Sequence, residues 1–147
     1  MSYKLIKNNL LLIEEKEIYF PEYSLIKSVT ELKNTICFYT FPKSDDLNWN
    51  KVETQQIWRE RCENNPSEFF CYKTSGIFKW KLPEKNITGF GEIDLDKLRE
   101  SDFLTTEHYK KYINKYRGKE LLEVYAGNFR FVVDGDTGEI YDKMESR

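Results

Sequence analysis

Three carboxylates alternate along one short stretch of the chain, and their spacing could carry chemistry. Single residues separate Glu92, Asp94 and Asp96, so in an extended strand they would share one face. Clustered carboxylates can serve as general acid and base, or bind a divalent metal. They are also typical of a solvated outer strand face, which suits contact with a basic protein and needs no catalytic geometry. We favour the solvated face and take these residues as the first candidates for partner binding.

The single histidine limits the chemistry further. His108 is the only histidine, which excludes a Cys₂His₂ zinc site and any site that needs two histidines. It falls in the first turn of an expected helix, where the helix dipole disfavours an imidazolium cation. No nucleophile motif accompanies it. We therefore expect a surface or structural histidine and name no catalytic residues; this leans against an enzyme but leaves that question open.

An acidic run near the C-terminus begins like an EF-hand calcium loop. Asp134 and Asp136 fit its first and third positions, but Gly138 and Glu139 occupy the fifth and sixth, where an Asp or Asn and a Gly are needed. A hairpin turn explains these residues. The chain also has no Gly-rich phosphate loop and no Gly-x-Ser-x-Gly elbow. The sequence predicts no metal and no cofactor.

A hairpin expected between Phe69 and Leu82 interleaves aromatic residues with lysines. On an exposed face this pattern would make a stacking platform for single-stranded nucleic acid. Strand alternation instead places the aromatic residues and most lysines on opposite faces. Phe70 and Tyr72 would then share the core side with Trp80. Together with a net charge of −2, this makes nucleic-acid binding the least favoured function.

The clearest element is a helix from about Thr106 to Arg117. Thr105 can cap its N-terminus, and Leu104 precedes Tyr109 at the spacing of a hydrophobic staple. Gly118 can adopt the left-handed conformation that follows a last helical turn. Four residues recur at the spacing of one apolar helix face: Tyr109, Tyr112, Ile113 and Tyr116. Such a face must lie on a sheet.

Several β-forming runs supply that sheet. Thr35–Phe41 predicts a central strand, and Leu121–Tyr141 predicts a hairpin that turns at Asp134–Gly138. A weaker helical pattern covers about 52–63. We expect an α+β fold in which a mostly antiparallel sheet of about five to seven strands carries two principal helices (about 52–63 and 106–117). The chain of 147 residues would form a single globular domain, 1–147.

The number and spacing of the cysteines indicate in which kind of cellular compartment the protein is found. Cys37, Cys62 and Cys71 are an odd number at unrelated spacings, which is neither a disulfide framework nor a zinc pattern. Cys37 and Cys71 lie in expected aromatic strands, so we predict buried, reduced thiols and a reducing compartment such as the bacterial cytoplasm. The N-terminus shows no secretory signal, and no stretch approaches the ~20 apolar residues that span a bilayer.

Two classes of function remain. The first is a small binding protein that occludes another, basic protein, most concretely a bacterial immunity protein or antitoxin-like inhibitor of a toxin. Its candidate partner-binding residues are Glu92, Asp94, Asp96, Trp49 and Trp58. Exposed aromatic residues could equally form a homodimer interface.

The second class is a ligand-binding domain or an enzyme whose pocket is assembled from scattered residues. The candidates for that pocket are Trp49, Trp58, Arg59, Arg61 and Tyr72. Neither class implies a membrane partner.

Overall fold

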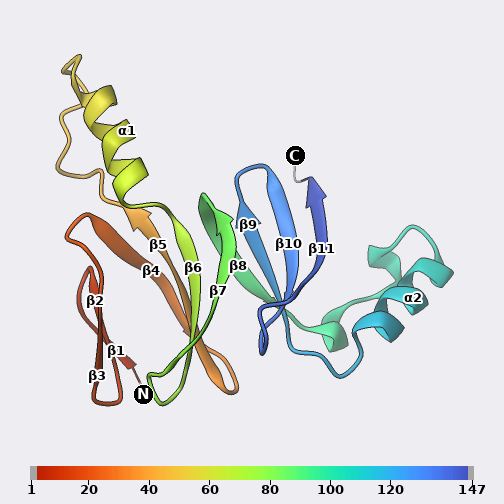
Figure 1. The fold of residues 1–147 in the computed structure, drawn as a ribbon. Helices are drawn as coiled ribbons and strands as arrows, with labels where there is room; N and C mark the ends of the chain where they lie inside the picture. Colours follow the sequence, from red (N-terminus) through yellow and green to blue (C-terminus); the bar gives the residue numbers. More distant parts are fainter. Residues whose placement is uncertain (1–2, 146–147) are drawn as a thin grey trace. The chain divides into compact units, whose positions relative to one another are not determined.

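The computed structural model describes residues 3–145, which form eleven strands in three antiparallel sheets, two α-helices and two 3₁₀ turns (Figure 1). The chain divides into two compact units, residues 1–89 and 90–147, which we call unit 1 and unit 2. The broad α+β class is confirmed. The expected single sheet of five to seven strands is wrong, because short hairpins build three smaller sheets. That the chain is a single domain stays a prediction.

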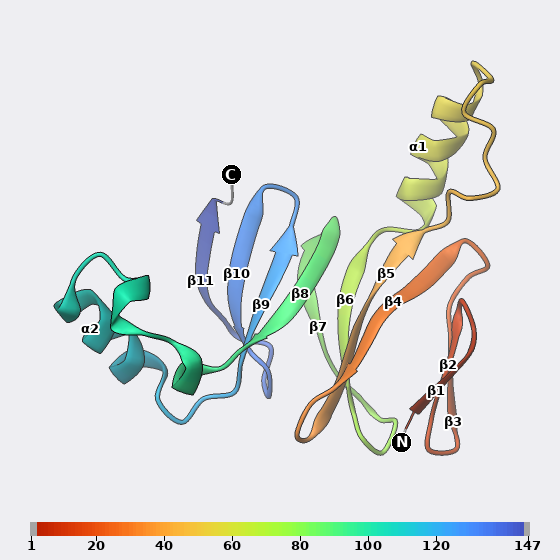
Figure 2. The ribbon, with the colours of Figure 1, turned by 180° about the vertical axis from the view of Figure 1, so that it is seen from behind.

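Unit 1 holds two of the sheets, which Figure 2 shows from behind. The first has the order β1-β2-β3, with bounds Tyr3–Lys7, Leu10–Ile13 and Lys16–Tyr19. The second has the order β4-β5-β6-β7, with bounds Ser24–Glu31, Thr35–Pro42, Glu68–Lys73 and Phe78–Lys85. Helix α1 (Thr54–Asn64) lies between β5 and β6 in the chain. As the sequence predicts, the apolar run in β5 is a central strand.

The core of unit 1 forms where the two sheets meet. Leu11 and Ile13 of β2 pack in one cluster with Ile36 and Phe38 of β5. The Phe38 side chain is fully buried. Its ring centroid lies 5.6–5.8 Å from those of three other aromatic rings: Phe20, Phe70 and Tyr72. A few large aromatic side chains therefore fill this core.

Strand β6 is covered on both faces, which the sequence did not predict. Phe69 and Cys71 are fully buried, while Phe70 and Tyr72 face the cluster around Phe38. Trp80 of β7 lies opposite Cys71 and packs on Phe69 with 5.6 Å between ring centroids. The expectation that Phe70 and Tyr72 share a side with Trp80 is therefore wrong. Alternation does not reveal the inward face of a strand when both faces are apolar.

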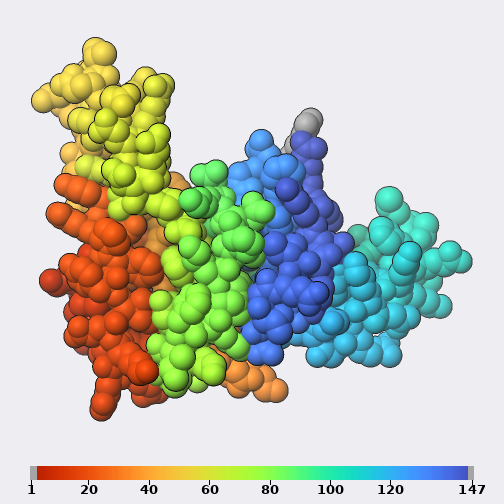
Figure 3. Space-filling model, in the orientation of Figure 1, coloured from red at the N-terminus to blue at the C-terminus, as the bar shows by residue number. Residues whose placement is uncertain are grey.

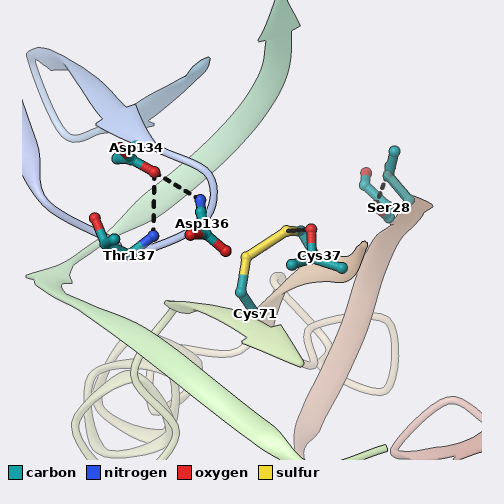
Figure 4. Close-up of a disulfide and its surroundings, with 8 residues drawn as sticks. Ser28, Cys37, Cys71, Asp134, Asp136 and Thr137 are labelled. Atoms are coloured by element: carbon teal, nitrogen blue, oxygen red, sulfur yellow. Dashed lines mark hydrogen bonds between the residues drawn. A yellow bond between two sulfur atoms is a disulfide. The ribbon is translucent and has the colours of Figure 1, made fainter. Parts of the chain in front are cut away.

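A disulfide joins β5 to β6 (Figure 4). Cys37 and Cys71 are direct register partners with 4.4 Å between Cα atoms, the spacing of a non-hydrogen-bonded antiparallel pair. Both side chains are fully buried, as predicted. The prediction of reduced thiols is wrong, because strand register, which the spacing in sequence does not show, brings the two sulfur atoms together. The inference of a reducing compartment loses this support. Cys62 is a free thiol.

Helix α1 starts two residues later than expected and makes few buried contacts. Thr54 is its only buried residue, so α1 presents no buried apolar face to a sheet, contrary to the prediction. Figure 3 shows α1 and the preceding loop standing out from the strands of unit 1 in yellow. Arg61 anchors this segment, with Nη1 2.6 Å from Asp46 Oδ1 and the guanidinium 4.0 Å from the Tyr23 ring centroid.

Unit 2 is built on the third sheet, in the order β11-β10-β9-β8. Its strands span Ile140–Glu145, Phe129–Asp134, Leu121–Ala126 and Ile87–Ile93, so that β8 starts just before the unit boundary. Between β8 and β9 the chain forms η1 (Leu95–Lys97), η2 (Glu100–Asp102) and helix α2 (Thr106–Tyr116). The helix predicted over 106–117 is confirmed to within one residue.

The ends of α2 follow the sequence signals closely. Thr105 Oγ1 accepts a hydrogen bond from the His108 N–H at 3.0 Å, and Gly118 has a φ of +79°. The expected staple is wrong, because the Leu104 side chain is 94% exposed. The neighbouring Phe103 instead packs on Tyr109 at 5.4 Å between ring centroids. Tyr116, the last residue of the predicted apolar helix face, is buried in the core of unit 2.

Candidate functional site

Unit 2 contains an open hollow of about 900 Å³ between the end of β8, η1 and η2, the middle of α2, and β9–β10. Six carboxylates line it: Glu92, Asp94, Asp96, Asp102, Glu120 and Glu123. Three cations line it as well: Lys97, Lys119 and Arg130. We call this cavity the acidic hollow. Its excess of carboxylates favours a positively charged occupant.

All three carboxylates singled out in the sequence line the acidic hollow, but they do not share a strand face. Strand β8 ends at Ile93, and the Asp94 side chain caps η1 by accepting a hydrogen bond from the Asp96 N–H at 3.0 Å. Aspartate competes for nearby backbone N–H groups in this way, which stops the strand. Within residues 3–145, none of Glu92, Asp94 and Asp96 forms an ion pair.

Aromatic side chains form part of the wall of the acidic hollow. Phe103 and Tyr112 both line it, with 5.3 Å between their ring centroids. Tyr112 also packs on the buried Tyr116 at 4.9 Å. Burial raises the pKa of the Tyr112 hydroxyl, which moves the phenolate form still further from neutral pH. An aromatic wall among carboxylates suits a guanidinium or ammonium group, which can contact both.

One guanidinium already lies in this environment. Arg130 of β10 donates to Glu123 of β9, with Nε 2.9 Å and Nη2 2.8 Å from Glu123 Oε2. The two residues are near neighbours across the β9–β10 pair, since Arg130 is opposite Tyr125. The pair shows that a planar cation can bind carboxylate on this wall.

A network of hydrogen bonds among Lys119, Asp134 and Tyr141 holds the start of β11 in place. Tyr141 Oη donates to Asp134 Oδ2 at 2.5 Å, and Lys119 Nζ donates to Tyr141 Oη at 3.1 Å. Asp134 Oδ1 also accepts from the N–H groups of Asp136 and Thr137, as Figure 4 shows. The expected hairpin turn is therefore confirmed. Lys119 belongs both to this hydrogen-bond network and to the lining of the acidic hollow.

These hydrogen bonds make a pH-dependent contribution to stability. Burial alone would raise the pKa of Asp134, but hydrogen bonds from Tyr141, Asp136 and Thr137 lower it overall. A lowered pKa contributes stability above the unfolded value, which is lost as the pH falls through the folded value. We expect Tyr141→Phe to cost about 1 kcal/mol at pH 7 and clearly less once Asp134 is protonated. Urea unfolding at pH 7 and near pH 2 measures both; an equal loss at the two pH values would contradict this account.

The two tryptophans predicted for partner binding lie in unit 1. Trp49 is 54% exposed and packs edge-on against Trp58 with 5.9 Å between ring centroids. Trp58 also contacts Phe41 of β5. The structure thus brings these tryptophans to each other, while the three acidic candidates gather in unit 2.

The scattered residues of the pocket hypothesis do not all meet. Tyr72 packs between Phe38 and Phe78, whereas Trp58 contacts Trp49 and Phe41. The other two candidates, Arg59 and Arg61, lie on α1, where Arg61 is held by Asp46 and Tyr23. Within residues 3–145, this set lines neither the acidic hollow nor the hollow beside Tyr39 and Phe41.

His108 lies exposed on the first turn of α2, where its ring contacts Phe103 at 5.7 Å. Among residues 3–145, no three His, Cys, Asp or Glu side chains are arranged to hold a metal ion. Within the same residues, neither helix is long and apolar enough to cross a membrane.

Sequence reasoning missed half of the carboxylates in the acidic hollow: Asp102, Glu120 and Glu123. These residues come from η2, the approach to β9 and β9 itself. No pattern in the sequence links them to Glu92, because the turn of the chain through η1, η2 and α2 brings them together.

No protein-family model, curated protein or solved structure matches this chain.

Proposed function

We propose that this protein binds and occludes a partner protein, and that the acidic hollow receives a basic segment of that partner. The observation that supports this most is the excess of six carboxylates over three cations around one cavity. Charge complementarity of this kind steers association and selects against acidic partners. The most concrete form of the proposal is a bacterial immunity protein or antitoxin-like inhibitor of a basic toxin.

The residues that line the acidic hollow indicate which basic side chain the partner carries. Phe103 and Tyr112 offer ring faces, and Glu92 and Asp96 offer carboxylates that are exposed and form no ion pair within residues 3–145. An arginine can stack on an aromatic ring and bind a carboxylate with two N–H groups at once, which a lysine cannot. The partner segment is therefore one that carries arginine.

A short arginine peptide tests the site without knowledge of the natural partner. We expect tetra-arginine to shift the backbone amide NMR signals of residues 92–98 and 120–123 in the ¹⁵N-labelled protein, with weaker shifts from tetra-lysine. Added salt should reduce both, because exposed charges are screened over about 10 Å at 0.1 M. Shifts spread evenly over both units, or none at 92–98, would contradict the proposal.

Charge variants give the matched control. Glu92→Lys with Asp96→Lys should abolish the tetra-arginine shifts at 92–98, because it reverses two exposed charges of the hollow. Asp94 stays unchanged, since its side chain caps η1. Glu15→Lys with Glu17→Lys makes the same charge change at exposed positions of unit 1 and should leave the shifts intact. Equal loss with both pairs would reduce the effect to net charge and remove the hollow from consideration.

A further inference from the structure

The disulfide of unit 1 sits where it closes a long excursion of the chain. Cys37 and Cys71 are 34 residues apart, and they face each other on the two central strands of the β4–β7 sheet. The chain between them leaves β5, forms the loop and α1, and returns along β6. The bond therefore ties together the two ends of the excursion inside the sheet.

The part of the excursion outside the sheet, the loop and α1, buries few of its own side chains. Thr54 is the only buried residue of α1, and Val52 just before it is 93% exposed. Its anchors include the Arg61 contacts with Asp46 and Tyr23, the packing of Trp58 on Phe41, and the buried Asn65 at the end of α1. A cross-link that closes a loop of this length lowers the entropy of the unfolded chain substantially.

The close packing around the two sulfur atoms also disfavours a folded state in which Cys37 and Cys71 are two separate thiols. Both cysteines are fully buried, and Cys71 lies opposite Trp80, which packs on Phe69. Two unbonded sulfur atoms need more room than a bonded pair, and a close-packed interior yields that room only with strain. Burial also keeps thiol reagents away from the bond until unit 1 opens.

We propose that the Cys37–Cys71 disulfide is a redox-controlled staple, so that unit 1 reaches its full stability only in the oxidised state. Reduction by a dithiol breaks the Cys37–Cys71 bond, gives each cysteine a proton and leaves the dithiol as a cyclic disulfide. Formation uses a disulfide oxidant such as glutathione disulfide: the two cysteines lose their protons and form the bond, and the oxidant is reduced to two glutathione thiols. The oxidised protein fits an oxidising compartment, since cytosolic reductants keep most thiols reduced. This inference is independent of the acidic hollow, which lies in unit 2.

The distribution of residues separates the two units in one experiment. All three cysteines and all three tryptophans lie in residues 1–89, and residues 90–147 contain neither type. Tryptophan fluorescence therefore reports unfolding of unit 1, and peptide-resolved hydrogen exchange reports each unit.

The test compares the full chain in two redox states. The oxidised protein is equilibrated with glutathione disulfide, and the reduced protein is treated with dithiothreitol in urea and refolded with the reagent present. We expect a Cys37–Cys71 peptide in non-reducing mass mapping, with Cys62 open to alkylation. Reduction should lower the fluorescence Tm by about 10 °C or more. Hydrogen exchange should speed up within residues 1–89 only.

Variants keep the test decisive. Cys62→Ser should retain the full response to dithiothreitol, while the double variant Cys37→Ala with Cys71→Ala should lose it and unfold near the reduced Tm. If Cys37 and Cys71 are alkylated after equilibration with glutathione disulfide, both thiols are free, the disulfide does not form and the proposal is overturned. A reductive change in Tm below about 3 °C, or equal loss of protection in both units, would also overturn the proposal.

Discussion

Phe38→Ala is expected to lower the free energy of unfolding of unit 1 by about 3–5 kcal/mol. The side chain is fully buried in the cluster between the two sheets, and its ring packs on Phe20, Phe70 and Tyr72. Truncation removes these contacts and leaves a cavity that rigid strands on both sides cannot close. Urea unfolding followed by tryptophan fluorescence measures the loss.

Phe78→Ala is the matched control for this prediction. Phe78 is 52% exposed, and its ring packs on that of Tyr72 with 5.6 Å between centroids. Removing the same number of atoms there should cost at most about 1 kcal/mol. Similar losses at both positions would mean that the two sheets do not form one core around Phe38.

Tyr116 should give opposite results for two substitutions in unit 2. Its ring is 1% exposed and contacts Tyr112 and Tyr141, so Tyr116→Ala should cost about 3 kcal/mol or more. Its hydroxyl is buried and has no hydrogen-bond partner within residues 3–145. Because an unpaired buried hydroxyl costs free energy, Tyr116→Phe should be neutral or stabilise by about 1 kcal/mol.

Hydrogen exchange of peptides from residues 90–147 follows unit 2, which lacks tryptophan. The comparison of Tyr116→Phe with Tyr116→Ala separates the ring from its hydroxyl. A loss above about 1 kcal/mol for Tyr116→Phe would show that the hydroxyl has a partner, such as a bound water, and would contradict our description of this core.

Local signals in the sequence predicted local structure well. Helix α2 carries its cap at Thr105 and its stop at Gly118, and each signal acts within one turn. The turn after Asp134 is similarly determined by one side chain, whose carboxylate accepts hydrogen bonds from two nearby backbone N–H groups. Long-range pairing was not predictable in this way. The side on which Phe70 lies depends on a second sheet, and the Cys37–Cys71 bond depends on strand register.

The candidate site shows the same contrast between predictable local features and unpredictable long-range contacts. The carboxylates at 92, 94 and 96 were noticed because they are close in sequence, although Asp94 turns the chain where a strand was expected. Glu123 joins them only because β8 and β9 are neighbours in one sheet. Residues that the fold brings together from separate elements carry no shared pattern that a single sequence could reveal.

The most direct test of the proposed function is a parallel capture experiment with three tagged proteins: the unchanged chain, the Glu92→Lys/Asp96→Lys variant and the Glu15→Lys/Glu17→Lys variant. Each is used to capture partners from the native lysate under oxidising conditions, and bound proteins are quantified by mass spectrometry. We predict one stoichiometric basic partner with the unchanged chain and with the unit 1 variant, and its loss with the variant of the acidic hollow. A partner retained equally by all three proteins, or none captured by the unchanged chain, would contradict the proposal.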